Sequence, residues 1–207
     1  MSNIYSVDEL AGKSNVLFAV KDETNAIDLC FIVLADFDEK SMQIKIVDDE
    51  SATTRMYNTD GEKGLKNYVS SRYNISIDKY AVFQEKDFKS FLSKFDGIMI
   101  NVPERIDYKS YDFNLLLEQG QQSISGDIAY KLLKVCSKDK IESVLCDIVN
   151  SVLTPKFIDK SESLFKTFVN SSVTDISIVD YTDKIDMLKI YANAEDKFKP
   201  TPYTTGG

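Results

Sequence analysis

The sequence predicts an α/β protein, a three-layer α-β-α sandwich in which helices cover both faces of a mixed central sheet. Two continuous apolar runs, residues 16–20 and 29–34, are typical of strands that are buried on both faces. The alternating segment 43–47 predicts a third strand, nearer an edge of the same sheet. Apolar residues at helical spacing fill most of the second half of the chain, and these helices supply the covering layers.

Helices and short strands alternate after residue 60. Segment 62–73 places apolar residues on one helical face, and segment 86–95 does so with three phenylalanines. Between them, residues 80–83 predict a short strand. Gly97 is expected to cap the second helix, because glycine adopts the left-handed conformation that ends many helices. Residues 98–102 then predict a further strand.

The second half predicts four helices in a single domain that spans residues 1–192. Ser125 is a suitable N-cap for the first of them. The next, residues 141–152, has the most regular apolar spacing in the chain, and two more are expected around residues 164–169 and 178–188. Residues 193–207 are rich in Pro, Gly and Thr without periodicity, which predicts a disordered tail.

Composition excludes several classes of function. The 207 residues carry a net charge of −8, and their arginines are Arg55, Arg72 and Arg105, so no basic surface for nucleic acid is expected. The chain has no histidine, which excludes Ser-His-Asp and Cys-His catalysis and His-ligated metal sites. The three cysteines are spaced too widely for a zinc or CxxC redox motif and are interpreted as small apolar residues.

No segment has the length and hydrophobicity of a membrane span or a signal peptide. The longest apolar run, residues 29–35, is far shorter than the roughly 20 residues that a bilayer requires. Contact with a membrane is therefore expected only through an anchor that this sequence does not contain.

The order of motifs between residues 75 and 149 resembles one known family. The segments ISIDKYAVF, IMINVPERI and LLLEQGQQSISGDIAYKLLKV follow one another with helices between and after them, and several spacings agree together. This pattern resembles the LytR-CpsA-Psr family of bacterial cell-envelope proteins, which transfer glycopolymers from a polyprenyl pyrophosphate carrier onto the wall. The resemblance implies an extracytoplasmic location at the cell envelope, and a polyprenyl lipid carrier or a cell-wall glycopolymer as partner. It also implies an elongated apolar cavity for the lipid chain, lined by helices within residues 65–95 and 125–152. The acidic residue with which the family closes the first strand would fall near Lys21 or Asp22.

The resemblance also assigns roles to individual residues. Asp28 keeps the family's carboxylate at the entry to the second strand, where it would act in catalysis and bind Mg²⁺ if the protein is active. Family members carry arginines at the positions of four residues here: Lys134, Cys136, Lys140 and Ser143. Lys134 and Lys140 are the candidate pyrophosphate-binding residues, although lysine lacks the planar fork with which arginine binds phosphate.

Simpler interpretations exist for the same residues. Lys134 and Lys140 lie on amphipathic helices, where most lysines are solvated surface residues. Asp28 precedes an apolar strand, where a turn or cap role is as plausible as a metal role. The acidic segment 48–50 is better explained as an exposed turn than as a cation site.

The function predicted from the sequence is a non-catalytic member of this family. Such a protein would bind or scaffold polyprenyl-linked glycopolymer or wall components, with no cofactor. The alternative is an active phosphotransferase that attaches a polyprenyl-pyrophosphate-linked glycopolymer to the wall, using Asp28, Mg²⁺ and lysines in place of arginines. The lost arginines favour the first, because each charge-assisted hydrogen bond to a phosphate contributes roughly 1.5–3 kcal/mol.

Overall fold

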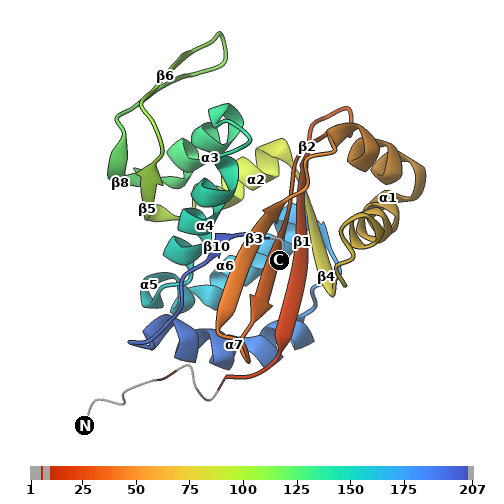
Figure 1. Ribbon diagram of the computed structural model, residues 1–207, viewed down its shortest axis with the longest axis vertical. Coiled ribbons are helices and arrows are strands. Elements are labelled where there is room, and N and C mark those ends of the chain that lie inside the picture. Colours follow the sequence, from red (N-terminus) through yellow and green to blue (C-terminus); the bar gives the residue numbers. More distant parts are fainter. Residues whose placement is uncertain (1–5, 7–9, 205–207) are drawn as a thin grey trace.

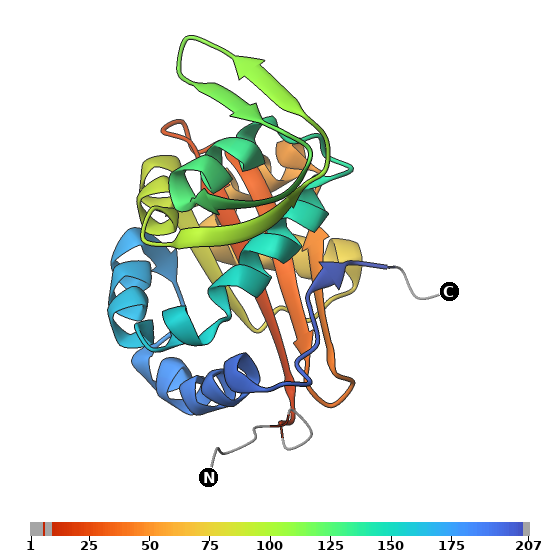
Figure 2. The same cartoon turned by 90° about the vertical axis from the view of Figure 1, so that its left-hand side faces the viewer.

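The centre of the molecule is a six-stranded mixed sheet with the strand order β10-β3-β2-β1-β4-β9 (Figure 1). The computed structural model describes residue 6 and residues 10–204. The strands of the sheet are β1 (Lys13–Lys21), β2 (Ile27–Asp36), β3 (Ser41–Ile46), β4 (Lys79–Gln84), β9 (Ser172–Thr174) and β10 (Thr201–Pro202). The first three strands form an antiparallel meander, whereas β4 runs parallel to β1. The predicted α/β class, with helices on both sides of a mixed sheet, is confirmed (Figure 2).

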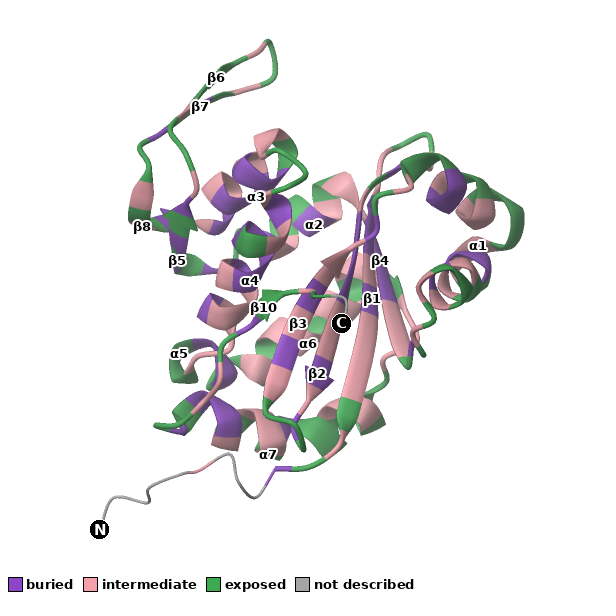
Figure 3. Cartoon of the chain, viewed as in Figure 1, coloured by how far each residue is buried: buried purple, intermediate pink, exposed green. Residues whose placement is uncertain are grey.

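Both faces of the sheet are buried because β1 and β2 are apolar at successive positions. Leu17 and Ile32 point to one face, where they pack with Leu65 of helix α1 (Glu50–Tyr73). On the other face Phe18 stacks on Phe31, with 5.2 Å between ring centroids. This second face carries the larger core and is covered by the remaining helices (Figure 3).

Helix α1 begins at Glu50, whereas the sequence predicts a helix only over residues 62–73. The side chain of Asp49 accepts a hydrogen bond from the Ala52 amide and so caps the helix. The helix is kinked at Asp60 and Gly61, whose backbone angles are not helical, and the predicted segment 62–73 is only the part after this kink. The acidic segment 48–50 is therefore partly a helix cap rather than only an exposed turn.

The prediction that Gly97 caps a helix is wrong. Helix α2 (Glu85–Leu92) ends at Leu92, and Gly97 lies in strand β5 (Asp96–Val102) with φ of +76°. The pairing of β5 with β8 (Gly120–Ser125) is irregular between Asp96 and Ile98. Glycine is required here for a bulge in the strand, which also needs a positive φ.

Two small sheets extend the molecule. The predicted strand over residues 98–102 is part of β5, whereas the sequence did not indicate the other three strands. Strands β5 and β8 pair as one of them, and β6 (Ile106–Lys109) and β7 (Asn114–Leu117) form a hairpin. The hairpin projects from the body of the protein and is largely exposed (Figures 1 and 3). Its strands were missed because each is only four residues long and neither alternates clearly between apolar and polar residues.

The helices of the second half follow the predicted order. They are α3 (Gly126–Val135), α4 (Ile141–Val152), the short α5 (Pro155–Ile158), α6 (Ser161–Ser171) and α7 (Ile178–Asn193). Ser125 caps α3 by accepting a hydrogen bond from the Ile128 amide, as predicted. The side chains of Glu142 and Asp147 on α4 accept hydrogen bonds from strand amides of Ile46 and Asn101, which joins the central sheet to the small one.

The structure differs from the expectation of a disordered segment after residue 192. Thr201 and Pro202 pair in parallel with β3, and the amide of Tyr203 donates to the carbonyl of Ile44. Phe198 packs edge-on against Phe37 and Tyr191. Aromatic packing and an available strand edge hold this segment, and neither leaves a periodic sequence signal. The last three residues of the predicted tail, 205–207, lie outside the described part of the chain.

Candidate functional site

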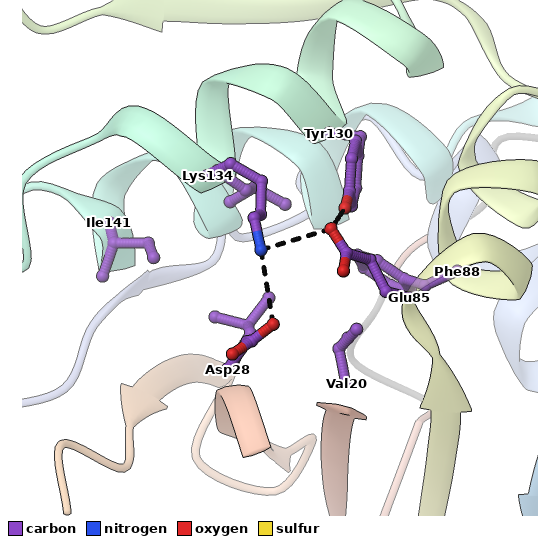
Figure 4. Close-up of a pocket in the computed structure, with 9 residues that line it drawn as sticks. Val20, Asp28, Glu85, Phe88, Tyr130, Lys134 and Ile141 are labelled. Carbon is purple, nitrogen blue, oxygen red and sulfur yellow. Dashed lines mark hydrogen bonds and ion pairs between the residues drawn. The ribbon is translucent and has the colours of Figure 1, made fainter. Parts of the chain in front are cut away.

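Four polar side chains from three elements meet at one end of the sheet (Figure 4). Asp28 is the second residue of β2, and Glu85 is the first residue of α2, directly after β4. Tyr130 and Lys134 are four residues apart on α3, so they lie on the same face of that helix. These residues line a cavity of about 170 Å³, here called the mouth, with Val20, Leu29, Phe88, Leu133 and Ile141.

Lys134 bridges the two carboxylates of the mouth. Its Nζ lies 3.3 Å from Oδ2 of Asp28 and 3.2 Å from Oε1 of Glu85. The hydroxyl of Tyr130 donates a hydrogen bond to the same oxygen of Glu85. All three charged side chains are partly exposed, between 35% and 38%. The mouth therefore contains a connected network that remains open to solvent.

The network shifts the pKa values of its members. The hydrogen bond from Tyr130, followed by the interaction with Lys134, keeps the pKa of Glu85 below its usual value despite burial. Burial, and then the Glu85 carboxylate, raises the pKa of Tyr130. Burial alone would lower the pKa of Lys134, but Asp28 and Glu85 together raise it. Glu85 and Lys134 are thus charged at neutral pH, and Tyr130 is a hydrogen-bond donor.

A third carboxylate, that of Asp22, lies in the turn between β1 and β2. Its Oδ1 accepts hydrogen bonds from the amide and hydroxyl of Thr24, both at 2.7 Å, and from the amide of Ala26 at 2.9 Å. The Thr24 side chain is the main cause of its lowered pKa, and Lys134 contributes through its charge. Asp22 lies at the end of the first strand, where the family resemblance predicts an acidic residue.

The structure brings Asp28 and Lys134 together but not Lys140. Lys140 precedes α4 and forms an ion pair of 2.8 Å with Glu104, and it does not line the mouth. Cys136 is half-buried, and burial followed by the charge of Glu104 raises the pKa of its thiol. Ser143 is exposed on α4. Of the four positions where arginine was expected, only Lys134 places a cation among the residues of the mouth.

A larger apolar cavity of about 440 Å³ adjoins the mouth. Phe88 and Leu133 line both spaces, so the two spaces are neighbours. The apolar cavity lies between the sheet and the helices of the second face. Its walls include Phe18 and Phe31 of the sheet, Phe91 of α2, Val149 of α4, and Phe165 and Phe168 of α6.

The apolar cavity differs in one wall from the sequence prediction, which assigned it to helices within residues 65–95 and 125–152. Helices α2, α3 and α4 contribute as predicted, but α1 covers the opposite face of the sheet. Helices α6 and α7 take its place. None of the residues of α6 is buried, although Phe165 and Phe168 point toward the cavity, because the space that they face is not filled by protein.

The carboxylates of the mouth do not fit a magnesium site. Nowhere in residues 10–204 do three His, Cys, Asp or Glu side chains gather as they would around a metal ion. Asp28 and Glu85 already face the ammonium of Lys134, and Asp22 is held by its own turn. Mg²⁺ prefers several oxygen ligands at about 2.1 Å, and here a lysine occupies the space between two of them.

Comparison with known proteins places this geometry in a family. The LytR_cpsA_psr family model matches residues 39–202, which is most of the chain. This chain belongs to the LytR_cpsA_psr family. Members of the family are associated with the cell envelope and are involved in attaching glycopolymers to the cell wall. No curated protein matches the sequence.

Solved structures share the LytR_cpsA_psr fold at low sequence identity. TagV from B. subtilis is 17% identical with a TM-score of 0.72, and the match covers 95% of this chain and 86% of TagV. Lin1025 from Listeria innocua is 14% identical with a TM-score of 0.69, covering 93% of this chain and 82% of the other. TagT, solved bound to LI-WTA, is 14% identical with a TM-score of 0.61, covering 91% and 78%.

Sequence reasoning missed two members of the mouth of this LytR_cpsA_psr protein, Glu85 and Tyr130. Glu85 follows a short strand and precedes an amphipathic helix, where an acidic residue is common for helix stability alone. Tyr130 lies on the inward face of α3 and would be interpreted as core. The spacing of Tyr130 and Lys134 was a possible signal, since it places both polar groups on one helical face. Nothing in the sequence indicated that Glu85 would meet them.

Across residue 6 and residues 10–204, no helix has both the length and the apolar character needed to cross a membrane.

Proposed function

We propose that this LytR_cpsA_psr protein is a binding member of its family that holds the apolar chain of a polyprenyl lipid carrier without transferring a glycopolymer from it. The apolar chain would occupy the cavity between the sheet and helices α2, α4, α6 and α7, and the head of the ligand would lie at the mouth. The location would be extracytoplasmic, at the cell envelope.

The observation that carries this proposal is the pairing of the two spaces. An apolar cavity of about 440 Å³ lined by aromatic and aliphatic side chains favours a hydrocarbon chain, since burial of apolar surface is favourable by about 25 cal/mol per Å². The adjoining mouth is polar and open to solvent. An amphiphile whose tail and head differ in this way matches both spaces at once.

The absence of transfer rests on the charges of the mouth. Catalysis on a pyrophosphate requires compensation of the charge that develops on the leaving phosphate. Lys134 is the one cation among the described residues that line the mouth, and its charge is shared by Asp28 and Glu85. A single ammonium group that is already paired with two carboxylates supplies none of the bidentate contacts that arginines would provide.

An active phosphotransferase remains the competing candidate because Asp28 lies at the mouth, where the family resemblance expects a catalytic carboxylate. In that case Asp28 would act with bound Mg²⁺, and Lys134 would contact the pyrophosphate. The carboxylates of the mouth do not fit that ion as they stand, which favours the binding protein.

Two measurements test the proposal. Displacement of an environment-sensitive dye by compounds with a geranylgeranyl chain should show saturable binding at one site. Incubation with a prenyl pyrophosphate-linked sugar, an acceptor glycan and Mg²⁺ should release no prenyl phosphate. Failure of every compound with this chain to bind would refute the proposal. Turnover that disappears in Asp28→Ala would establish the phosphotransferase instead.

A further inference from the structure

The mouth carries more negative than positive charge. Asp28 and Glu85 line it, and Asp22 acts on both Glu85 and Lys134 from the adjoining turn. Two carboxylates thus line the mouth beside one ammonium group. The other lysines of α3 and of the segment after it pair elsewhere: Lys131 with Asp127, Lys138 with Glu50 and Lys140 with Glu104. An anion that enters the mouth meets net repulsion.

The hydrogen-bonding capacity of the mouth points the same way. An ionised carboxylate only accepts hydrogen bonds, and so does a fully ionised phosphate. The second oxygens of the two carboxylates, Asp28 Oδ1 and Glu85 Oε2, make no hydrogen bond to any residue in the described part of the chain, and the side chains are more than a third exposed. These acceptors can be satisfied only by water or by a ligand that donates.

Lys134 leaves room for one further acceptor. An ammonium group has three N–H donors, and Lys134 directs two of them toward Asp28 and Glu85. The third can reach a single ligand oxygen. A group that donates to a carboxylate and accepts from one ammonium is a hydroxyl, and a primary amine would satisfy the carboxylates alone.

We propose that the mouth selects an amphiphile whose head is an uncharged hydroxyl group, a long-chain prenyl alcohol, over the corresponding phosphate or pyrophosphate. This inference rests on the proposed function, because it assumes that the tail of the ligand fills the apolar cavity. It adds the chemical form of the carrier that the protein accepts: the form without phosphate.

The test compares two ligands with the same tail. Geranylgeraniol and geranylgeranyl pyrophosphate are titrated against the full chain in buffer with EDTA and in buffer with Mg²⁺. The expected result is that the alcohol binds at least tenfold more tightly in both buffers. Equal or tighter binding of the pyrophosphate, in either buffer, would overturn the inference and leave the proposed function intact. Binding of neither compound would overturn both.

Variants of the two carboxylates test whether the mouth causes the preference for the alcohol. Asp28→Asn with Glu85→Gln removes two negative charges at nearly constant shape and should narrow the affinity ratio between alcohol and pyrophosphate at least tenfold. Asp127→Asn is the matched control, because Asp127 is an acidic residue of α3 that pairs with Lys131 outside the mouth. It should leave the ratio unchanged. If the double variant does not fold, as judged by circular dichroism, Glu85→Gln alone is used, and an unchanged ratio there counts against the inference.

Discussion

Lys134 and Asp28 are 106 positions apart in the sequence, and their side chains meet with 3.3 Å between Nζ and Oδ2. This contact joins helix α3 to strand β2 across the mouth. The same ammonium reaches Glu85 at the start of α2, so one lysine connects the sheet and two helices. The geometry of the mouth therefore depends on how closely α2 and α3 approach each other.

Gly126 sets that approach, and Gly126→Ala should disrupt it. A Cβ at this position would lie 1.6 Å from the carbonyl oxygen of Leu92, a backbone atom that no rotamer change can move away. Helix α3 would have to shift from α2, at a cost of roughly 3 kcal/mol or more. Thermal unfolding should show a Tm about 6–12 °C lower, given a shift of about 2–4 °C per kcal/mol in a chain of this size.

The control for Gly126→Ala is Asp127→Ala, one residue further along α3. It removes two partly exposed ion pairs, with Lys131 and Lys89, and creates no clash. Its Tm should change much less, because such pairs contribute about 0–1 kcal/mol. A Gly126→Ala protein as stable as the wild type would contradict the close contact between α2 and α3.

Filling the apolar cavity should abolish binding of the tail. Val149 lines the cavity from α4 and is only partly buried, so Val149→Phe places a ring in the open space. The affinity for geranylgeraniol should fall at least tenfold while the Tm stays equal or rises, because the added ring gains apolar contacts. Dye displacement and calorimetry measure the two effects.

Val179→Phe is the control for the cavity variant, since it makes the same change at a position that is 62% exposed and does not line the cavity. It should bind the ligand as the wild type does. Unchanged affinity in Val149→Phe would mean that the hydrocarbon chain binds elsewhere.

Most of the fold could be predicted from the sequence because its layers are coded by local apolar patterns. Residues 141–152 were predicted as a helix and form α4 with those bounds. The errors occur where tertiary contacts outweigh local signals. Asp49 caps a helix whose first half has little apolar periodicity, and Gly97 serves a strand bulge although it follows a helix.

The site was predictable only in part. Asp28 and Lys134 were selected through the family resemblance, and the structure places them in contact. Lys140 was selected on the same grounds, yet it pairs with Glu104 away from the mouth. Glu85 is brought to the mouth by the packing of α2 on α3, a long-range relationship that one sequence does not reveal.

The docked C-terminal segment should contribute measurably to stability. Phe198 lies 5.7 Å from Phe37 and 5.1 Å from Tyr191, measured between ring centroids. Because the side chain is only partly buried, Phe198→Ala should cost about 1–3 kcal/mol, below the roughly 3–5 kcal/mol of a fully buried phenylalanine. Urea unfolding measures the change. The neighbouring variant Lys199→Ala, at an exposed position, should leave the free energy of unfolding unchanged. If Phe198→Ala also left it unchanged, the segment would not be docked and the prediction of a disordered tail would stand.

The last prediction concerns Asp147, whose carboxylate accepts a hydrogen bond from the Asn101 amide at 2.8 Å. Burial raises the pKa of Asp147, so the folded state holds this proton more tightly than the unfolded state does. Stability therefore falls as pH rises through the interval between the unfolded and folded pKa values, and the cost is fully present at neutral pH.

Asp147→Asn keeps an acceptor for the amide and removes the charge. Its Tm should exceed that of the wild type by a few degrees at pH 7, and this advantage should vanish below about pH 4, where the unfolded aspartate is also protonated. Asp183→Asn, at an exposed position on α7, should show no such pH-dependent gain. A Tm difference between Asp147→Asn and the wild type that is smaller at pH 7 than at pH 4 would contradict this prediction. The charged carboxylate would then be stabilising the junction between α4 and β5.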